Sequence, residues 1–597
     1  MGKKIVIVGG VAGGATAAAR LRRLDESAEI IVLERTGFVS YANCGLPYYV
    51  GGVIPEKSSL TLQSPESFRI RFNIDVRVLS EVTAIDRESK TVAVRNLATG
   101  EEYSLPYDKL ILSPGAKAMV PDTPGVHSKR VLKLRTVEDA LEMRRIVEEE
   151  KPERAVVVGG GFIGLEAAEN LMEAGVKVTL LQRSEQVLPP LDWDMACELH
   201  SHLREKGLDL RFKHSVESYE ELENGIRVHV AGRESIDCSF VVLAVGVVPE
   251  SELAAAAGLE LGPKGSIMVD SHMRTSDPDI YAVGDAVPVT DPVTGKLKLT
   301  PLAGPANKQG RIAADNICGI QSEYHGTLGS SVVKVFDLTA ATTGLNEKSA
   351  KAAGVKYERI VGYWGNHAGY YPGAQNMLVK VLFDPDSGKI LGAQIVGPSG
   401  VDKRIDVFAT AIRAGMTGAD LAELELSYAP PYGSAKDPVN MCGFMIENIT
   451  GGIVKQFHLL ILDSVAFQGA GALVHHADHA QHGVVGSPHG GHQDVAGFQR
   501  PEQGAGDGVG AVDELQAHQG VLGAEDVGVD LIQGVPAQIV VAVAGGASEV
   551  GLRHPVFLEG RQHLAGVLLR NGVDAAELLG QLRLGLGSQG QNFVAYL

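Results

Sequence analysis

The feature that most constrains the fold is a pattern that occurs twice: a β-branched run, a glycine-rich turn, and a run of small, helix-favouring residues. The first copy reads "KIVIVGGVAGGATAAARLRRL" and leads to "EIIVLE", which ends at Glu34. A strand, a turn, a helix and a parallel strand form a βαβ unit, in which a dinucleotide pyrophosphate meets the helix N-terminus and the final acid accepts ribose hydroxyls. Val11 replaces the middle glycine between Gly9 and Gly14, so this copy departs from the full motif.

The second copy, "RAVVVGGGFIGLEAAENL", keeps all three glycines: Gly159, Gly161 and Gly164. The strand expected after its helix, "KVTLLQR", ends at Gln182 and Arg183. An acid at this place favours the unphosphorylated cofactor, and an arginine accommodates a 2′-phosphate. Because the acid is absent and an arginine is adjacent, NADH and NADPH both remain open. Either motif alone could be a tight turn that binds nothing, but two in one chain disfavour that interpretation.

Length, charge and cysteine usage bound the remaining choices. A chain of 597 residues exceeds the roughly 250–300 residues of a single core, so we expect several domains. The net charge of −18 disfavours a nucleic acid or an anionic membrane as partner, and no apolar run approaches the ~20 residues of a membrane span. The five cysteines are too scattered for a disulfide framework or a zinc site. We therefore expect a cytoplasmic protein without a bound metal.

Three further segments complete a known pattern: "YDKLILSPGA", "FVVLAVGVVPES" and "RTSDPDIYAVGDA". With them the chain resembles the pyridine nucleotide-disulfide oxidoreductases over about residues 1–455. The resemblance implies an α/β fold with two Rossmann-like domains, one inserted in the other, followed by an α+β dimerisation domain. The FAD-binding domain would comprise residues 1–115 and 245–325, the NAD(P)H-binding domain 116–244, and the dimerisation domain 326–455. In the last, "SSVVKVFDLTAATTG" and "MLVKVLFDPDSGKILGAQIVG" predict antiparallel strands with alternating burial.

The resemblance also implies which residues bind the two cofactors. In this family the aspartate of "YAVGD", here Asp285, binds the ribityl chain of FAD, and the first glycine turn and Glu34 hold the rest of that cofactor. The complete set of expected cofactor-binding residues is Gly9, Val11, Ala12, Gly14, Glu34, Arg35, Val82, Ser113, Gly115, Gly159, Gly161, Ile163, Gly164, Gln182, Gly246, Asp285 and Ala303.

The segment "SYANCGLPYYVGG" contains the candidate nucleophile, Cys44. Classical members of the family carry a second redox cysteine five positions later, where this chain has Tyr49, and a C-terminal His-Glu pair, where it reads "LSYAPPYGSAKDPVN" without histidine. Both departures resemble the branch with a single redox cysteine: coenzyme A-disulfide reductases, persulfide reductases, and NADH oxidases and peroxidases. A helix starting after Cys44 would favour its thiolate, which attacks disulfide sulfur. An inert buried thiol is the alternative.

The string "YANCGLPYYVGGVI" looks most like the coenzyme A-disulfide and persulfide reductases, and this likeness assigns substrate contacts. Arg20 and Arg23 are three residues apart and so share a helix face, which suits a nucleotide phosphate but could also be a solvated basic face. In the absence of a histidine, Tyr370 and Tyr428 of a partner subunit would serve as acid or hydrogen-bond donor. Asn307 stands where the disulfide reductase has a histidine. The full set of expected substrate residues is Thr16, Arg20, Arg23, Ser40, Asn43, Arg71, Asn307 and Lys436.

We therefore expect a homodimeric flavoprotein that passes a hydride from NAD(P)H through FAD to Cys44, which reduces coenzyme A disulfide or persulfide. One alternative is an NADH oxidase or peroxidase in which Cys44 becomes a sulfenic acid. Another is a flavoprotein that binds a partner without turnover, which the complete second glycine motif disfavours.

Residues 456–597 differ in composition from the rest of the chain. Relatives with the junction "GGIVKQFH" usually continue into a rhodanese domain, but no cysteine follows Cys442 and no lysine follows Lys455. Half of the 18 histidines fall after residue 458. We expect a segment that is disordered or translated from a shifted frame, without sulfurtransferase activity. The alternative is a metal-binding segment around His475, His479 and His482.

Overall fold

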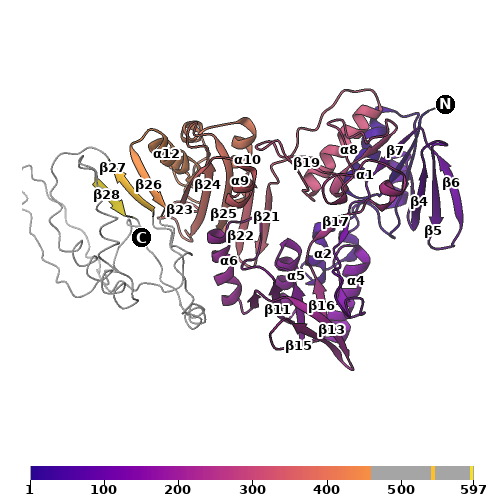
Figure 1. Ribbon diagram of the computed structural model, residues 1–597, viewed down its shortest axis with the longest axis horizontal. Coiled ribbons are helices and arrows are strands. Elements are labelled where there is room, and N and C mark those ends of the chain that lie inside the picture. Colours follow the sequence, from indigo (N-terminus) through magenta and orange to yellow (C-terminus); the bar gives the residue numbers. More distant parts are fainter. Residues whose placement is uncertain (1, 459–539, 545–591, 596–597) are drawn as a thin grey trace, which may run out of the picture. The chain divides into compact units, whose positions relative to one another are not determined.

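The structure is a computed structural model, and it describes residues 2–458, 540–544 and 592–595. The chain divides into two compact units, residues 1–452 and 453–597. The first unit contains all predicted site residues. It is built on three five-stranded sheets (Figure 1).

The first sheet is entirely parallel and is built from β-branched runs such as "KIVIV". One face packs against helices: Ile5 and Ile7 share a cluster with Leu21 of α1 (Ala12–Leu24) and with α8 (Ala303–Ile317). The other face packs against an antiparallel sheet, since Val6 shares a cluster with Val92. The parallel strands are, in order, β18 (Ile280–Ala282), β7 (Lys109–Leu112), β1 (Lys4–Val8), β2 (Glu29–Leu33) and β3 (Asp75–Arg77); the antiparallel ones are β4 (Ser80–Asp86), β5 (Thr91–Asn96) and β6 (Glu102–Pro106).

The second sheet repeats this architecture. Val157 and Val242 face α5 (Phe162–Glu173) and α6 (Trp193–Glu205), whereas Val156 and Val241 face a three-stranded antiparallel sheet. Its parallel strands are, in order, β12 (Asp209–Phe212), β11 (Lys177–Gln182), β10 (Arg154–Val158), β16 (Phe240–Leu243) and β9 (Val131–Leu132); the antiparallel ones are β13 (Val216–Leu222), β14 (Gly225–Val230) and β15 (Ile236–Cys238).

The chain leaves the first sheet after β7, forms the second sheet, and returns to the first as β18. The two segments that connect these sheets pair with one another as antiparallel strands, β8 (Ala116–Ala118) and β17 (Val247–Pro249). This confirms two Rossmann-like folds, one inserted in the other, while the numbered domain boundaries stay a prediction. The other elements of this half are α2 (Leu46–Val50), α3 (Pro65–Phe72), α4 (Val137–Arg145), α7 (Glu252–Ala256), β19 (Val289–Thr290) and β20 (Leu297–Lys298).

The third sheet is antiparallel, as predicted; the expected alternation of buried and exposed residues is confirmed in the strand Ser331–Val335 but is wrong for the long central strands. Both long central strands are buried on both faces. Leu378 and Val396 join the core of the second sheet, whereas Val379 and Ile395 pack with Phe408 of α10 (Val401–Ala414). The strands are, in order, β21 (Ser331–Val335), β22 (Leu338–Gly344), β25 (Ile390–Gly397), β24 (Asn376–Phe383) and β23 (Glu358–Gly365); the further helices are α9 (Glu347–Ala353), α11 (Gly418–Glu423) and α12 (Pro438–Thr450).

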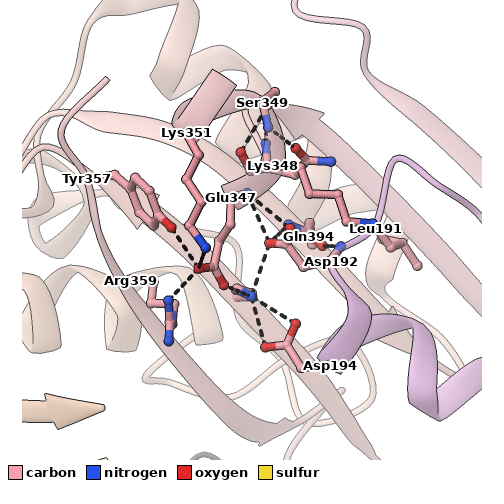
Figure 2. A network of polar contacts seen from close by, with 12 residues as sticks. Leu191, Asp192, Asp194, Glu347, Lys348, Ser349, Lys351, Tyr357, Arg359 and Gln394 are labelled. Carbon is pink, nitrogen blue, oxygen red and sulfur yellow. Dashed lines mark hydrogen bonds and ion pairs between the residues drawn. The ribbon is translucent and has the colours of Figure 1, made fainter. Parts of the chain in front are cut away.

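Buried charges join the second and third sheets (Figure 2). Lys380 of β24 is fully buried, and its ammonium contacts Asp192, Asp194 and Glu347. Although burial works against the charged form, these carboxylates raise the pKa of Lys380. The three acids are close enough to one another to hold a metal ion, but the lysine ammonium supplies the positive charge there. The lysine therefore fixes the start of α6 against the third sheet.

The described part of the second unit is an antiparallel sheet of β26 (Val454–His458), β27 (Val540–Ala544) and β28 (Asn592–Ala595). The predictions for residues 456–597, including the histidines at positions 475, 479 and 482, lie almost wholly outside the described residues. Among the described helices, none has the length and apolar character needed to cross a membrane.

Candidate flavin and cysteine site

The predicted cofactor residues gather where parallel strands end. In the first sheet Gly9 follows β1, Glu34 follows β2, Ser113 follows β7, and Asp285 lies three residues beyond β18. The carboxyl ends of parallel strands meet at one edge of a sheet, which is where α/β proteins bind nucleotides. The second sheet presents three residues in the same way: Gly159 directly after β10, Gln182 as the last residue of β11, and Gly246 three residues beyond β16.

The first glycine turn is closed too tightly for side chains at two of its positions. A Cβ on Gly14 would lie 1.9 Å from the carbonyl oxygen of Gly9, and one on Gly9 would lie 2.1 Å from the Ser113 oxygen. Val11, which replaces the middle glycine, has φ −102°, a value open to any residue. The structure thus explains how the imperfect motif still forms the turn.

The two turns hold their terminal strand residues by the same hydrogen bond. The amide of Gly10 donates to Glu34 Oε2 at 2.9 Å, and the amide of Gly160 donates to Gln182 Oε1 at 3.0 Å. Glu34 is buried. The first glycine turn thus contacts a carboxylate at the position where the second contacts the neutral amide of Gln182. Arg183 beside Gln182 is exposed, and among the described residues it makes no ion pair. This arrangement leaves both nicotinamide cofactors open.

Three helix N-termini at these edges fit anionic groups. Helices α1, α5 and α8 begin without a side-chain cap and without an acid in their first turn. By contrast, Ser64, Thr136, Asn346, Thr417 and Asp437 cap other helices of the chain. Uncapped amides at a helix start suit phosphate. A Cβ on Gly161, at the start of α5, would meet no atom within 4 Å, so space is open there. The residues present therefore fit dinucleotides at both turns.

Arg135 connects the predicted ribityl-binding acid to the cysteine loop. Its guanidinium donates to Asp285 Oδ2 at 2.8 Å and to the carbonyl of Ala116 at 2.9 Å. Asn43, with its amide oriented to satisfy both atoms, donates to the carbonyl of Arg135 at 2.9 Å and accepts from its guanidinium at 3.1 Å. Sequence reasoning missed Arg135, because it lies just before the helix cap Thr136, where no motif marks it.

Cys44 is the exposed member of the five cysteines, none of which is disulfide-bonded. It lies in a 3₁₀ turn, Asn43–Gly45, directly before α2. Desolvation by the surrounding protein raises the pKa of its thiol, and the Glu166 carboxylate adds to the rise while the Arg135 guanidinium opposes it. The short helix expected directly after Cys44 is present as α2, which has only five residues, but desolvation and the Glu166 carboxylate together raise the pKa of the thiol.

Glu166 of α5 reaches this loop from the second Rossmann fold. The Tyr48 hydroxyl donates to Glu166 Oε1 at 3.2 Å. Desolvation raises the pKa of Glu166 to about 7. The Tyr48 hydrogen bond lowers this pKa, and the nearby Glu169 carboxylate raises it. Sequence reasoning missed both residues, although an acid in "FIGLEAAEN", directly after the glycine turn, was a usable signal.

The predicted substrate residues form separate groups. Thr16 Oγ1 donates to Asn307 Oδ1 at 2.9 Å between α1 and α8. The guanidinium carbons of Arg23 and Arg71 lie 6.0 and 5.5 Å from the centre of the Phe72 ring.

The joint role of Arg20 and Arg23 stays a prediction, although the two arginines have different partners. Arg20 instead donates to Asp315 of α8 at 2.7 Å, so its charge is already paired inside the first Rossmann fold.

Tyr370 and Tyr428 are neighbours despite their distance in sequence. Their hydroxyl oxygens are 2.7 Å apart, and their side chains are 76% and 48% exposed. Lys436 is exposed on the same α+β domain, next to Asp437, which caps α12. Among the described residues, no hydrogen bond links either tyrosine to Cys44. One chain therefore presents the tyrosine pair and the cysteine as separate groups.

The remaining predicted residues occupy scaffold positions. Arg35 pairs with Glu250, whose Oε2 accepts at 2.7 Å, and Ser40 is held by its amide, which donates to the carbonyl of Gly10 at 2.8 Å. The others lie in or beside elements already described: Ala12 in α1, Val82 in β4, Gly115 before β8, Ile163 and Gly164 in α5, and Ala303 at the start of α8.

Comparison with known proteins agrees with this geometry. Residues 3–310 match the family model of the pyridine nucleotide-disulphide oxidoreductases, and residues 330–437 match the dimerisation domain of that family. The curated coenzyme A disulfide reductase of Staphylococcus haemolyticus is 36% identical over 452 residues, which cover 75% of this chain and 100% of that protein.

Two solved structures are similar over the same region. Reduced CoADR-RHD of Bacillus anthracis is 52% identical, with 76% of this chain and 82% of that chain covered and a TM-score of 0.75. An NAD-dependent persulfide reductase of A. fulgidus is 42% identical, with 75% and 84% covered and a TM-score of 0.73. The predicted family, fold class and cofactors are thereby confirmed. The chain belongs to the pyridine nucleotide-disulphide oxidoreductases, enzymes that use FAD and NAD(P)H to reduce disulfides.

Proposed function

We propose that this protein is a homodimeric reductase of coenzyme A disulfide or coenzyme A persulfide, with Cys44 as its single reacting cysteine. The observation that carries the proposal is the place of Cys44: exposed, without a thiol partner, and joined through Asn43 and Arg135 to Asp285. Five residues later stands Tyr49, which is buried and cannot replace a second cysteine. A lone exposed thiol can form a mixed disulfide with a small-molecule disulfide.

The chemistry follows from these residues. Bound FAD supplies the two-electron exchange between nicotinamide and sulfur. The Cys44 thiolate attacks one sulfur of the substrate, the substrate S–S bond breaks, and its electron pair leaves with the other thiolate. Arg135 contributes a positive charge that opposes the raised pKa of Cys44. Two electrons from NAD(P)H then cleave the mixed disulfide and regenerate Cys44.

Two features support coenzyme A as the substrate class. Arg23 and Arg71 place two guanidinium groups against one Phe72 ring, an arrangement suited to a nucleotide with phosphates. The most similar proteins include a coenzyme A disulfide reductase and a persulfide reductase. A cytoplasmic location fits the free state of all five cysteines.

Intact-mass analysis of the as-purified holoenzyme under non-reducing conditions tests the proposal. We expect a coenzyme A adduct on Cys44 that dithiothreitol removes, together with loss of NAD(P)H-dependent coenzyme A disulfide reduction in Cys44→Ser. Cys197→Ser is the matched control, because that cysteine is half-buried on α6. Retained activity in Cys44→Ser would refute the proposal.

The rival function is reduction of oxygen or peroxide through a sulfenic acid, which an exposed thiol without a thiol partner also permits. In that case the as-purified Cys44 would carry one or more oxygens and no coenzyme A. NADH consumption would then respond to peroxide or oxygen and not to coenzyme A disulfide.

A mixing experiment tests the homodimer and the tyrosine pair together. One inactive variant carries Cys44→Ser, and the other carries Tyr370→Phe with Tyr428→Phe. If the tyrosines serve the partner's cysteine, random reassembly restores about one quarter of wild-type activity, because half of the dimers are mixed and each has one intact site. No recovery after verified subunit exchange would show that the tyrosines do not complete a partner's site.

A further inference from the structure

The Cys44 loop faces a carboxyl group for which the proposed reaction has no assigned role. Glu166 projects from α5 of the second Rossmann fold toward α2, where Tyr48 donates to it at 3.2 Å. It is partly buried, and among the described residues it makes no ion pair. The next acid on the helix, Glu169, is already satisfied, since it pairs with Lys334 and its Oε2 accepts from the amide of Phe336 at 2.8 Å.

The charges around the two groups set their coupling. Cys44 is influenced by Glu166 and Asp285, which oppose ionisation, and by Arg135, which favours it. Glu166 is influenced by Tyr48 and by Glu169. Asp285 pairs with Arg135 and Glu169 with Lys334. The charge on Glu166 is therefore the unneutralised one beside the thiol.

We propose that Glu166 is a positioning residue that controls the ionisation of Cys44: the two groups share one negative charge, and Tyr48 holds the carboxyl in place. When the Cys44 S–H bond breaks, sulfur keeps the electron pair and the proton passes to solvent, and this ionisation is easier when Glu166 is itself protonated and uncharged. Like charges at short distance do not ionise together without cost. Glu166 has a raised pKa of about 7, so its own charge changes near neutral pH. The inference rests on the proposed function only in taking Cys44 as the reacting thiol.

The pH dependence of Cys44 alkylation in the reduced holoenzyme tests this coupling. The rate of reaction with iodoacetamide, followed on the Cys44 peptide by mass spectrometry, reports the thiolate fraction without any substrate turnover. Glu166→Gln removes the charge, so the alkylation midpoint should fall by about one pH unit. Glu166→Asp, which keeps the charge, should stay near the wild-type midpoint.

Glu173→Gln is the matched control, because it removes the same charge from an exposed position further along α5. It should leave the midpoint unchanged. An unchanged or higher midpoint in a flavin-loaded Glu166→Gln enzyme would overturn the inference. Because the assay needs no coenzyme A, this result is independent of whether Cys44→Ser abolishes coenzyme A disulfide reduction.

Discussion

Lys380 Nζ lies 2.9 Å from each carboxylate oxygen of Asp194, and the lysine side chain is fully buried. The lysine belongs to β24 of the third sheet and the aspartate to the first turn of α6 of the second Rossmann fold. Asp192 and Gln394 add a second connection, because the Asp192 amide donates to Gln394 Oε1 at 2.6 Å. These contacts fix the proposed NAD(P)H-binding region against the sheet that carries the family's dimerisation motif.

Replacing Lys380 should destabilise the protein strongly. Lys380→Met leaves the carboxylates of Asp192 and Asp194 without their cation, and breaking a buried ion pair costs about 3–5 kcal/mol. Urea unfolding measures the loss. Lys356→Met is the control, since it removes an ion pair with Asp386 in which both side chains are exposed; such pairs contribute less than about 1 kcal/mol. Equal losses in the two variants would contradict the assigned role of Lys380.

Arg135 should act on Cys44 with the opposite sign to Glu166. Arg135→Gln removes the cation that lowers the pKa of the Cys44 thiol, so the alkylation midpoint of the reduced holoenzyme should rise by about one pH unit. Arg130→Gln, which removes a charge paired with Glu150 in the same segment of the chain, should not change it. A fall in the midpoint for Arg135→Gln would contradict the electrostatic role.

The parts of the fold that could be predicted from the sequence rest on local patterns. The two strand–glycine–helix units were predictable because a tight turn between β-branched and alanine-rich runs leaves few conformations, and the structure closes Gly9 onto Ser113 as that requires. The alternation expected for β24 failed for a non-local reason. One face of that strand packs on α10 and the other joins the core of the second sheet, so every residue after Asn376 is buried.

The site shows the same division between local and long-range information. Cys44 and Asp285 were found from motifs that lie next to them in the sequence. Arg135 and Glu166 meet the cysteine loop only through tertiary structure, from segments more than ninety residues away in the numbering. The raised pKa of Cys44 was missed for this reason, because the carboxylate that contributes to it lies on a helix of the other Rossmann fold.

The two glycine turns should respond differently to an added methyl group. Gly14→Ala places a Cβ 1.9 Å from the Gly9 oxygen, so the turn cannot close and the purified protein should lose FAD. Gly161→Ala meets no protein atom within 4 Å. It should fold and keep FAD, while the KM for NAD(P)H rises because the methyl group enters the space for the pyrophosphate.

The flavin-to-protein absorbance ratio and steady-state kinetics separate these outcomes. Val11→Gly is the matched control at the middle position of the first turn, whose φ of −102° suits either residue; it should keep FAD. A Gly14→Ala enzyme that retains full FAD would show that the turn opens at little cost.

His200 should make the fold sensitive to acid. It is buried on α6, its Nε2 accepts from the Val187 amide at 3.2 Å, and desolvation together with Arg204 lowers its pKa from 6.5 to about 3. Between these values the unfolded chain binds a proton that the folded chain does not, so stability falls as the pH drops below 6.5. The slope from this residue should approach about 1.4 kcal/mol per pH unit.

His200→Gln keeps an acceptor for Val187 and cannot titrate, so its unfolding free energy should depend less on pH over this range. His127→Gln, which removes an exposed histidine, is the control and should keep the wild-type slope. Identical slopes in the wild type and His200→Gln, measured by urea unfolding at a series of pH values, would show that His200 is charged in the folded protein.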